Sequence, residues 1–270
     1  MSFVPAHRVL EGEGARKTAF VLHGILGAGQ NFTSFIQKLS RRCPEYRFVL
    51  VDLRNHGASS GAPPPHTVAA CADDLLALAA VAGSPSLLIG HSFGGKVALE
   101  YARRAPPELE AVWVLDSNPG PQGPDEHGEI DTVLRAIRAV PMPASTRADV
   151  VSALEERGGL SRPTAEWLAT SVKRTPSGYV WLYDLDAIEA LLADYYALDL
   201  WPYLGELRST PAIHLVIAER SDRFTPALRE RALSLPASSG VRCHLLPDSG
   251  HWVHVDNPGG LLELMAPHVC

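Results

Sequence analysis

One serine in the sequence has the surroundings of a nucleophile. Ser92 lies in the segment Gly90-His91-Ser92-Phe93-Gly94-Gly95, after an apolar run and before a segment with helical periodicity. A serine at a sharp turn from strand to helix projects its hydroxyl above the sheet, and flanking glycines leave room for close neighbours. The free N–H groups at the start of the next helix favour an anion that develops nearby. This context predicts that Ser92 attacks a carbonyl carbon.

The same residues partly match a phosphate-binding loop. Gly90 to Lys96 reads GxxxxGK, but Val97 stands where such a loop has a serine or threonine that holds magnesium. The sequence also offers no evident acidic partner for magnesium. We therefore do not expect nucleotide binding, and we expect Lys96 to be a solvated or salt-bridged helix residue.

A second motif supplies candidates for binding a negatively charged oxygen. The segment His23-Gly24-Ile25-Leu26-Gly27 follows an apolar run well before Ser92. A tetrahedral oxyanion is stabilised by two converging N–H donors, one from the residue after the nucleophile and one from a loop after an early strand. We expect Phe93 to supply the first donor and Ile25 the second, with Leu26 as the alternative. Taken alone, the segment also fits a simple glycine turn.

Of the eleven histidines, His251 has the position expected of a general base. The base comes last in the chain order of nucleophile, acid and histidine, and His251 follows the final apolar run. A metal pair with His254 would be geometrically possible, but no third ligand and no HExxH pattern is present. We predict that His251 is the base, that no metal is bound, and that His91 and His56 are structural.

The carboxylate that orients the base has two candidates. Such a carboxylate fixes the tautomer of the imidazole and stabilises the imidazolium. Asp222 follows the strand before that of the histidine, and Asp116 ends the strand after the nucleophile helix. Both are expected at the carboxyl edge of the sheet, where ligands bind in open α/β folds. We favour Asp222 and keep Asp116 as the alternative acid; the other of the two is expected to be a turn or capping residue.

Short apolar runs predict the strands that position these residues. They are Thr18–Leu22, Arg47–Val51, Ser86–Ile89, Ala111–Leu115, Ala212–Ile217 and Val241–Leu246. Continuous apolar runs are typical of strands covered on both faces, as in a parallel sheet. Helical periodicity is found at Phe32–Leu39, Val68–Val81, Phe93–Ala105, Pro226–Leu235 and Leu261–Met265. The alternation predicts an α/β fold with a mostly parallel central sheet flanked by helices.

The stretch from Asp116 to Ala212 interrupts this alternation. A loop of such length without secondary structure is uncommon in a compact domain. We therefore predict a helical cap at residues 119–208, between the two parts of a core domain at residues 1–118 and 209–270. Aromatic residues gather in the cap, and we expect most of them to pack it onto the core. A few would line an apolar substrate pocket, for which the candidates are Trp181 in the cap and Leu26 and Trp252 in the core.

The composition excludes several classes of partner. A net charge of −6 provides no basic surface for nucleic acid. No apolar stretch reaches the roughly 20 residues that cross a bilayer, and the N-terminus does not resemble a secretory signal. The four cysteines have no metal-site spacing and are expected to be free thiols, which suits the cytoplasm. We expect a monomer or homodimer that acts on a small molecule in the cytoplasm.

Taken together, the motifs resemble the α/β-hydrolase superfamily. The segments HGILGAGQNF, VDLRNHGAS, GHSFGGKVALEYA, VLDSNP and SGHWVHVDNP are similar to an esterase branch that includes bacterial YbfF and the abhydrolase domain-containing protein eleven. The resemblance implies the α/β-hydrolase fold, with the cap inserted after the sixth strand, and hydrolysis of carboxylic esters or acyl thioesters without a cofactor. It supports Ser92 and His251, and Phe93 and Ile25 as oxyanion donors.

Two positions depart from the pattern of this branch. The branch commonly has methionine after the nucleophile where this chain has Phe93, which changes a pocket wall. It often has serine at the position of Asp222, which would leave the equivalent of Asp116 as the acid.

These observations predict a serine hydrolase that forms an acyl-enzyme on Ser92, with a short to medium acyl ester or thioester as substrate. The alternatives on the same residues are a carbon–carbon bond hydrolase, a lactonase or an acyltransferase, because one triad serves many chemistries. A non-catalytic receptor for small molecules is the further alternative.

Overall fold

The computed structural model describes residues 3–104, 106–123, 129–208, 210–236 and 239–270. Among these residues, a seven-stranded sheet has the order β1-β3-β2-β4-β5-β8-β9. The strands are β1 (His7–Leu10), β2 (Lys17–Leu22), β3 (Tyr46–Val51), β4 (Leu87–His91), β5 (Ala111–Leu115), β8 (Ala212–Ala218) and β9 (Val241–Leu246). Only β1 pairs antiparallel, with β3, and the other neighbours in the sheet are parallel. The predicted α/β class is confirmed.

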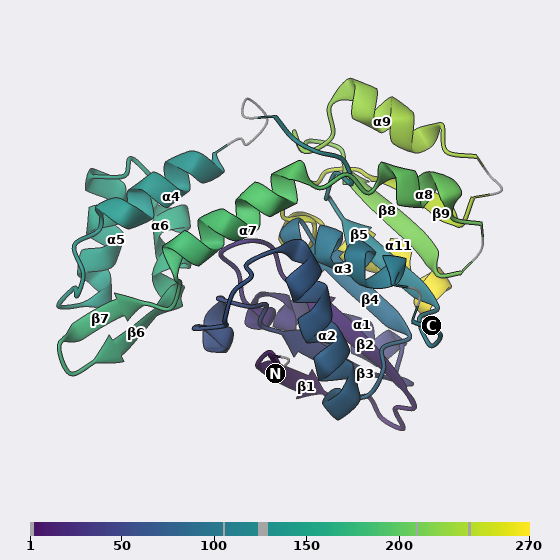
Figure 1. Ribbon diagram of the computed structural model, residues 1–270, viewed down its shortest axis with the longest axis horizontal. Helices are drawn as coiled ribbons and strands as arrows, with labels where there is room; N and C mark the ends of the chain where they lie inside the picture. The colour runs from purple at the N-terminus through teal and green to yellow at the C-terminus, as the bar shows by residue number, and fades with distance from the viewer. Residues whose placement is uncertain (1–2, 105, 124–128, 209, 237–238) are drawn as a thin grey trace.

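Helices cover both faces of the sheet (Figure 1). Those outside the segment between β5 and β8 are α1 (Thr33–Arg42), α2 (Val68–Ala82), α3 (Phe93–Arg103), α9 (Pro226–Leu233), α10 (Val253–Asp256) and α11 (Pro258–Val269). Residues of α2 and α3 belong to one hydrophobic core, and residues of α1 and α11 belong to the other. The periodic segments were therefore predicted correctly, although Ala105, the predicted end of α3, lies outside the described residues.

Side-chain alternation along the strands divides the apolar residues between these two cores. In β2, Phe20 and Leu22 pack in the core with α2 and α3, whereas Ala19 and Val21 pack in the core with α1 and α11. Successive side chains of a strand point to opposite faces, so a strand covered on both faces must be apolar at every position. This is why the strands of the sheet centre appear in the sequence as unbroken apolar runs.

The segment between β5 and β8 contains both helices and a hairpin. Its elements are α4 (Ile130–Ala139), α5 (Arg147–Glu156), α6 (Arg162–Leu168), β6 (Val172–Thr175), β7 (Gly178–Trp181), α7 (Leu185–Ala197) and α8 (Trp201–Glu206). In Figure 1, α4, α5, α6 and the β6–β7 hairpin lie together to one side, and α7 runs from them toward the sheet. The antiparallel hairpin was not predicted. The segment follows β5, the fifth strand in the chain, and not the sixth.

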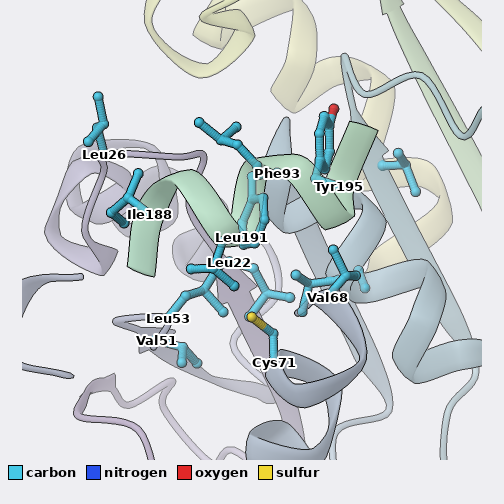
Figure 2. Packing of buried hydrophobic residues seen from close by; sticks show 14 of the residues in the cluster. Leu22, Leu26, Val51, Leu53, Val68, Cys71, Phe93, Ile188, Leu191 and Tyr195 are labelled. Carbon is cyan, nitrogen blue, oxygen red and sulfur yellow. The ribbon is translucent and has the colours of Figure 1, made fainter. Parts of the chain in front are cut away.

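The helix α7 packs this segment onto the sheet. Ile188 and Leu191 of α7 are buried in the same core as Leu22 and Leu53, and Figure 2 shows them side by side. Residues 124–128 of the predicted cap lie outside the described residues. The division of the chain at residues 119 and 208 stays a prediction.

A buried lysine joins this segment to the nucleophile helix. Lys96 of α3 is fully buried, and its ammonium donates hydrogen bonds to the carbonyl oxygens of Gly120 (2.7 Å), Tyr195 (2.6 Å) and Leu198 (3.0 Å). It also lies 4.3 Å from the centroid of the Tyr195 ring. The expectation of a solvated or salt-bridged lysine is wrong. In place of water, the ammonium is hydrogen-bonded by carbonyl oxygens of residues distant in the sequence. Burial lowers the pKa of Lys96 to about 7.

A disulfide bond joins Cys43, after α1, to Cys270, after α11, across 227 residues of sequence. The prediction of four free thiols is therefore wrong for this pair and correct for Cys71 and Cys243. The sequence spacing of Cys43 and Cys270 does not indicate a disulfide, because it is the packing of α11 against α1 that brings the two thiols together. The argument from free thiols for a cytoplasmic location does not extend to this pair.

Candidate active site

Ser92 occupies a strained turn between β4 and α3. Its backbone has φ 51° and ψ −119°, a conformation that L-residues adopt only where the surroundings enforce it. Glycines allow neighbouring backbone to approach this turn. A Cβ atom on Gly90 would lie 2.2 Å from the carbonyl oxygen of Gly94, and one on Gly94 would lie 2.6 Å from that of His23. The predicted turn from strand to helix is therefore present, with its glycines needed for space.

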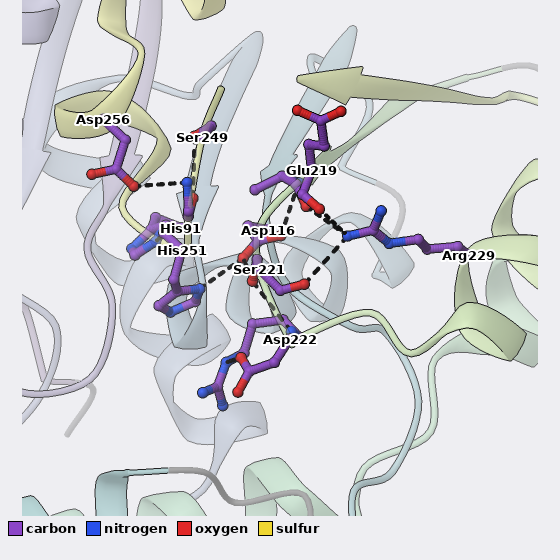
Figure 3. Close-up of polar contacts among 12 residues, drawn as sticks. His91, Asp116, Glu219, Ser221, Asp222, Arg229, Ser249, His251 and Asp256 are labelled. Atoms are coloured by element: carbon purple, nitrogen blue, oxygen red, sulfur yellow. Dashed lines mark hydrogen bonds and ion pairs between the residues drawn. The ribbon is translucent and has the colours of Figure 1, made fainter. Parts of the chain in front are cut away.

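The structure brings Asp116, and not Asp222, to His251 (Figure 3). Nδ1 of His251 lies 2.8 Å from Oδ2 of Asp116, which is completely buried. Asp116 also accepts hydrogen bonds from the Ser221 hydroxyl (2.5 Å) and from the Ala218 backbone N–H (3.0 Å). The carboxylate is thus held in a fixed position by three hydrogen bonds, from the end of β8, the loop after β8 and the loop after β9.

Asp222 faces the solvent instead. Its side chain is 75% exposed, and its carboxylate lies 3.0 Å from Nε of Arg223. Among the described residues, no hydrogen bond joins Asp222 to His251. The neighbouring Ser221, which sequence reasoning missed, is the residue of this loop that contacts the buried acid. Both aspartates lie at the carboxyl edge of the sheet as expected, but only the side chain of Asp116 points toward His251.

His91 connects the nucleophile turn to the loop that carries His251. Its Nε2 lies 2.8 Å from the backbone oxygen of His251, to which it donates, and the two rings lie 4.7 Å apart. Burial lowers the pKa of His91 well below its ordinary value, and burial also lowers that of His254 to about 4. Neutral rings therefore surround the imidazole of His251, so they add no positive charge there at neutral pH.

Ser92 and His251 line the same cavity. No hydrogen bond joins their side chains among the described residues. In structures without substrate, such contacts are often long and shorten only in the reacting complex. The structure therefore brings the two predicted residues to one cavity.

The loop after β2 supplies a backbone N–H group beside Ser92. A Cβ atom on Gly24 would lie 3.2 Å from that of Ser92, so this loop contacts the nucleophile directly. The N–H of Leu26 donates to Nε2 of His56 (3.1 Å) and is already used. The N–H of Ile25 has no such acceptor among the described residues, and the N–H of Phe93 opens α3, where no intrahelical acceptor exists. Of the two loop candidates, Ile25 is the one with a free donor.

The cavity next to Ser92 has a volume of about 500 Å³. The predicted wall residues Leu26 and Trp252 line it, but Trp181 does not and is therefore wrong as a pocket residue. Trp181 stacks on Tyr183 instead, with 5.9 Å between ring centroids. Further apolar and aromatic side chains from the segment between β5 and β8 complete the walls. They are Ile130, Val133, Trp167, Leu192, Tyr195 and Tyr196.

The fold and this arrangement define an α/β hydrolase. Residues 19–264 match the alpha/beta hydrolase family, so the chain belongs to this family and is a hydrolase enzyme. The predicted resemblance is confirmed. No described helix has the length and apolar character needed to span a membrane.

Two curated relatives and one solved structure illustrate the similarity. The sn-1-specific diacylglycerol lipase ABHD11 of Mus musculus is 27% identical over 267 residues, which cover 96% of this chain and 82% of that protein. Esterase YbfF of Escherichia coli is 21% identical over 245 residues, covering 90% and 89% respectively. The solved structure of a marine microorganism esterase has a TM-score of 0.83 at 22% identity and covers 98% of this chain and 99% of that one.

Proposed function

We propose that this hydrolase is a serine esterase or thioesterase that works through an acyl-enzyme on Ser92. The observation that carries the proposal is the 2.8 Å contact between His251 and the buried Asp116, next to a strained serine in the same cavity. The names of the relatives, a lipase and an esterase, agree with this class of reaction.

The hydrogen bond to Asp116 determines which nitrogen of His251 acts as the base. Because Nδ1 donates its proton to the carboxylate, the lone pair of the neutral imidazole is on Nε2. Nε2 takes the proton of Ser92 while Oγ attacks the carbonyl carbon. The resulting imidazolium is stabilised by the Asp116 carboxylate, which we propose as the acid of the triad in place of Asp222.

The remaining steps use backbone groups and water. The N–H groups of Phe93 and Ile25 stabilise the tetrahedral oxyanion, in a role where one donor is typically worth about 3–4 kcal/mol. Collapse of the tetrahedral intermediate breaks the ester or thioester bond, and His251 protonates the leaving alkoxide or thiolate. A water molecule then attacks the acyl-enzyme and gives a proton to His251. The bond between the acyl group and Ser92 Oγ breaks, His251 returns the proton to Oγ, and the carboxylic acid is released.

The cavity supports a short to medium acyl group. A volume of about 500 Å³ with mainly aromatic and aliphatic walls suits an apolar chain of limited length. The series to measure is p-nitrophenyl esters from acetate to octanoate, beside the coenzyme A thioesters of the same acids. Thioesters hydrolysed faster than all the esters would identify a thioesterase, and the chain length with the highest kcat/KM would indicate the size of the acyl site.

A fluorophosphonate probe tests the proposed nucleophile. The probe is expected to modify the wild-type protein on Ser92, and Ser92→Ala is expected to abolish both labelling and ester hydrolysis. Ser234→Ala, at an exposed serine on the surface, is the matched control and should keep both. Hydrolysis at the wild-type rate by Ser92→Ala would contradict the proposal. Labelling of Ser92 without turnover of any ester or thioester would instead favour another reaction on the same residues, or a receptor.

A further inference from the structure

An arginine side chain lines the otherwise mainly apolar cavity next to Ser92. Arg223 follows Ser221 in the loop after β8, and its backbone N–H donates to the Ser221 hydroxyl oxygen (3.2 Å). That hydroxyl in turn contacts Asp116. The backbone of Arg223 is therefore fixed close to the proposed acid, while its side chain borders the same cavity as Ser92 and His251.

The guanidinium of Arg223 has hydrogen-bonding capacity that the protein does not use. Its side chain is only 21% exposed, and Nε is buried without a hydrogen-bond partner. Within the described parts of the chain, no other residue accepts a hydrogen bond from this guanidinium. The carboxylate of Asp222 lies 3.0 Å from Nε but without hydrogen-bond geometry, and its side chain is 75% exposed to water. Arg223 thus forms a solvent-exposed ion pair with Asp222, and the donors of its guanidinium have no hydrogen-bond acceptor among the described residues.

Arg223 is the permanently charged cation among the described residues that line the cavity. Among the described lining residues, Glu129 is the only acidic one, and it is exposed. The tyrosines of α7 lie within the electrostatic reach of the arginine, because its charge acts to lower the pKa values of Tyr195 and Tyr196 against the opposing effect of burial. Arg223 therefore lies near the cavity wall formed by α7.

We propose that Arg223 forms a subsite for an anionic group, a carboxylate of the substrate, in the cavity where Ser92 acts. The guanidinium offers two parallel N–H donors that match a carboxylate, and such paired, charge-assisted bonds are stronger than neutral ones. The substrate class is then an ester or thioester that carries a carboxylate, on its acyl or its alcohol side. This assignment rests on the proposed function, since it concerns the substrate of the same site.

Matched pairs of substrates test the subsite. On the acyl side, mono-p-nitrophenyl glutarate carries a terminal carboxylate, and p-nitrophenyl valerate is its neutral counterpart. On the alcohol side, 4-carboxyphenyl butyrate is compared with phenyl butyrate. The measured quantity is the kcat/KM of the anionic ester divided by that of its neutral partner. In one of the two pairs, Arg223→Gln is expected to lower this ratio about ten- to a hundredfold.

Two further variants distinguish the charge from a structural role. Arg223→Lys keeps the charge but not the planar donors, so it should recover part of the ratio. Arg220→Gln is the matched control in the same loop, because Arg220 pairs with Asp248 at the surface and does not line the cavity. This control should leave both ratios at the wild-type values.

Binding of glutarate gives a readout that does not depend on catalysis. Calorimetry on Ser92→Ala is expected to show glutarate binding that is at least tenfold weaker when Arg223→Gln is added. Equal ratios in wild type and Arg223→Gln for both substrate pairs, or equal glutarate affinity with and without Arg223, would overturn the subsite. Hydrolysis of the neutral esters by Ser92→Ala would overturn the proposed function instead, and the glutarate measurement would still decide about Arg223.

Discussion

Replacement of Lys96 by methionine should change how the stability of the protein depends on pH. Methionine keeps an unbranched apolar chain in the buried position and removes the ammonium. In the folded protein the pKa of Lys96 is about 7, against an ordinary value of 10.5. Because the two pKa values differ by about 3.5 units, the contribution of Lys96 to the free energy of unfolding is about 5 kcal/mol lower below pH 7 than above pH 10.5.

The direction follows from the protons that are bound in each state. Between pH 7 and pH 10.5 the unfolded chain holds a proton on Lys96 that the folded protein has released. Unfolding then takes up a proton, so the free energy of unfolding rises with pH in this window by up to about 1.4 kcal/mol per pH unit. Below pH 7 both states are protonated and this dependence disappears.

Urea unfolding of wild type and Lys96→Met at pH 7.0 and pH 9.5 measures the effect. The free energy of unfolding of wild type, relative to that of the variant, should rise by about 3 kcal/mol between these two values. In this difference between wild type and variant, the contributions of groups that titrate in both proteins, such as the buried tyrosines, cancel. A relative stability that stays constant within about 0.5 kcal/mol would refute the reasoning. It would mean that the three carbonyl oxygens around the ammonium compensate fully for its burial.

Four further substitutions test the site and its supports. Asp116→Asn should lower kcat on a neutral ester about 1,000-fold or more, because the amide cannot hold His251 in the required tautomer. Asp222→Asn should lower kcat less than about fivefold. Steady-state kinetics in which Asp222→Asn is the more damaging change would contradict the assignment of the acid. Cys270→Ser should lower the free energy of unfolding by about 2–4 kcal/mol, and added dithiothreitol should then destabilise the wild type but not the variant. Gly94→Ala places a Cβ atom 2.6 Å from the His23 carbonyl oxygen and should cost about 1–3 kcal/mol in a thermal or urea melt; an unchanged stability would show that α3 can shift freely.

The central strands could be predicted from sequence because burial on both faces leaves a simple pattern. Of these central strands, β5 begins and ends at the predicted residues, and so does β9, which lies at the sheet edge. The strand β1 was missed since it is short, lies at the sheet edge and is largely exposed. The β6–β7 hairpin was missed for a related reason, because its residues are partly exposed and include Lys173 and Arg174.

For the candidate site, chain order identified residues but not the directions of side chains. Ser92 and His251 follow strands whose carboxyl ends meet at one edge, so their proximity could be predicted. Asp116 and Asp222 both satisfy that rule, and only the buried position of Asp116 brings its carboxylate to His251. Lys96 was misread because its carbonyl acceptors come from residues that are distant in the chain.

Among the contacts that hold the segment from His251 to Cys270 to the rest of the molecule, two lie at its two ends. His91 holds its beginning through the backbone oxygen of His251, and Cys43 holds its end through the disulfide with Cys270. Under oxidising conditions the disulfide holds α11 against α1, so the base should leave the site only when the whole domain unfolds. Reduction removes the covalent attachment and allows loss of activity to precede loss of the fold.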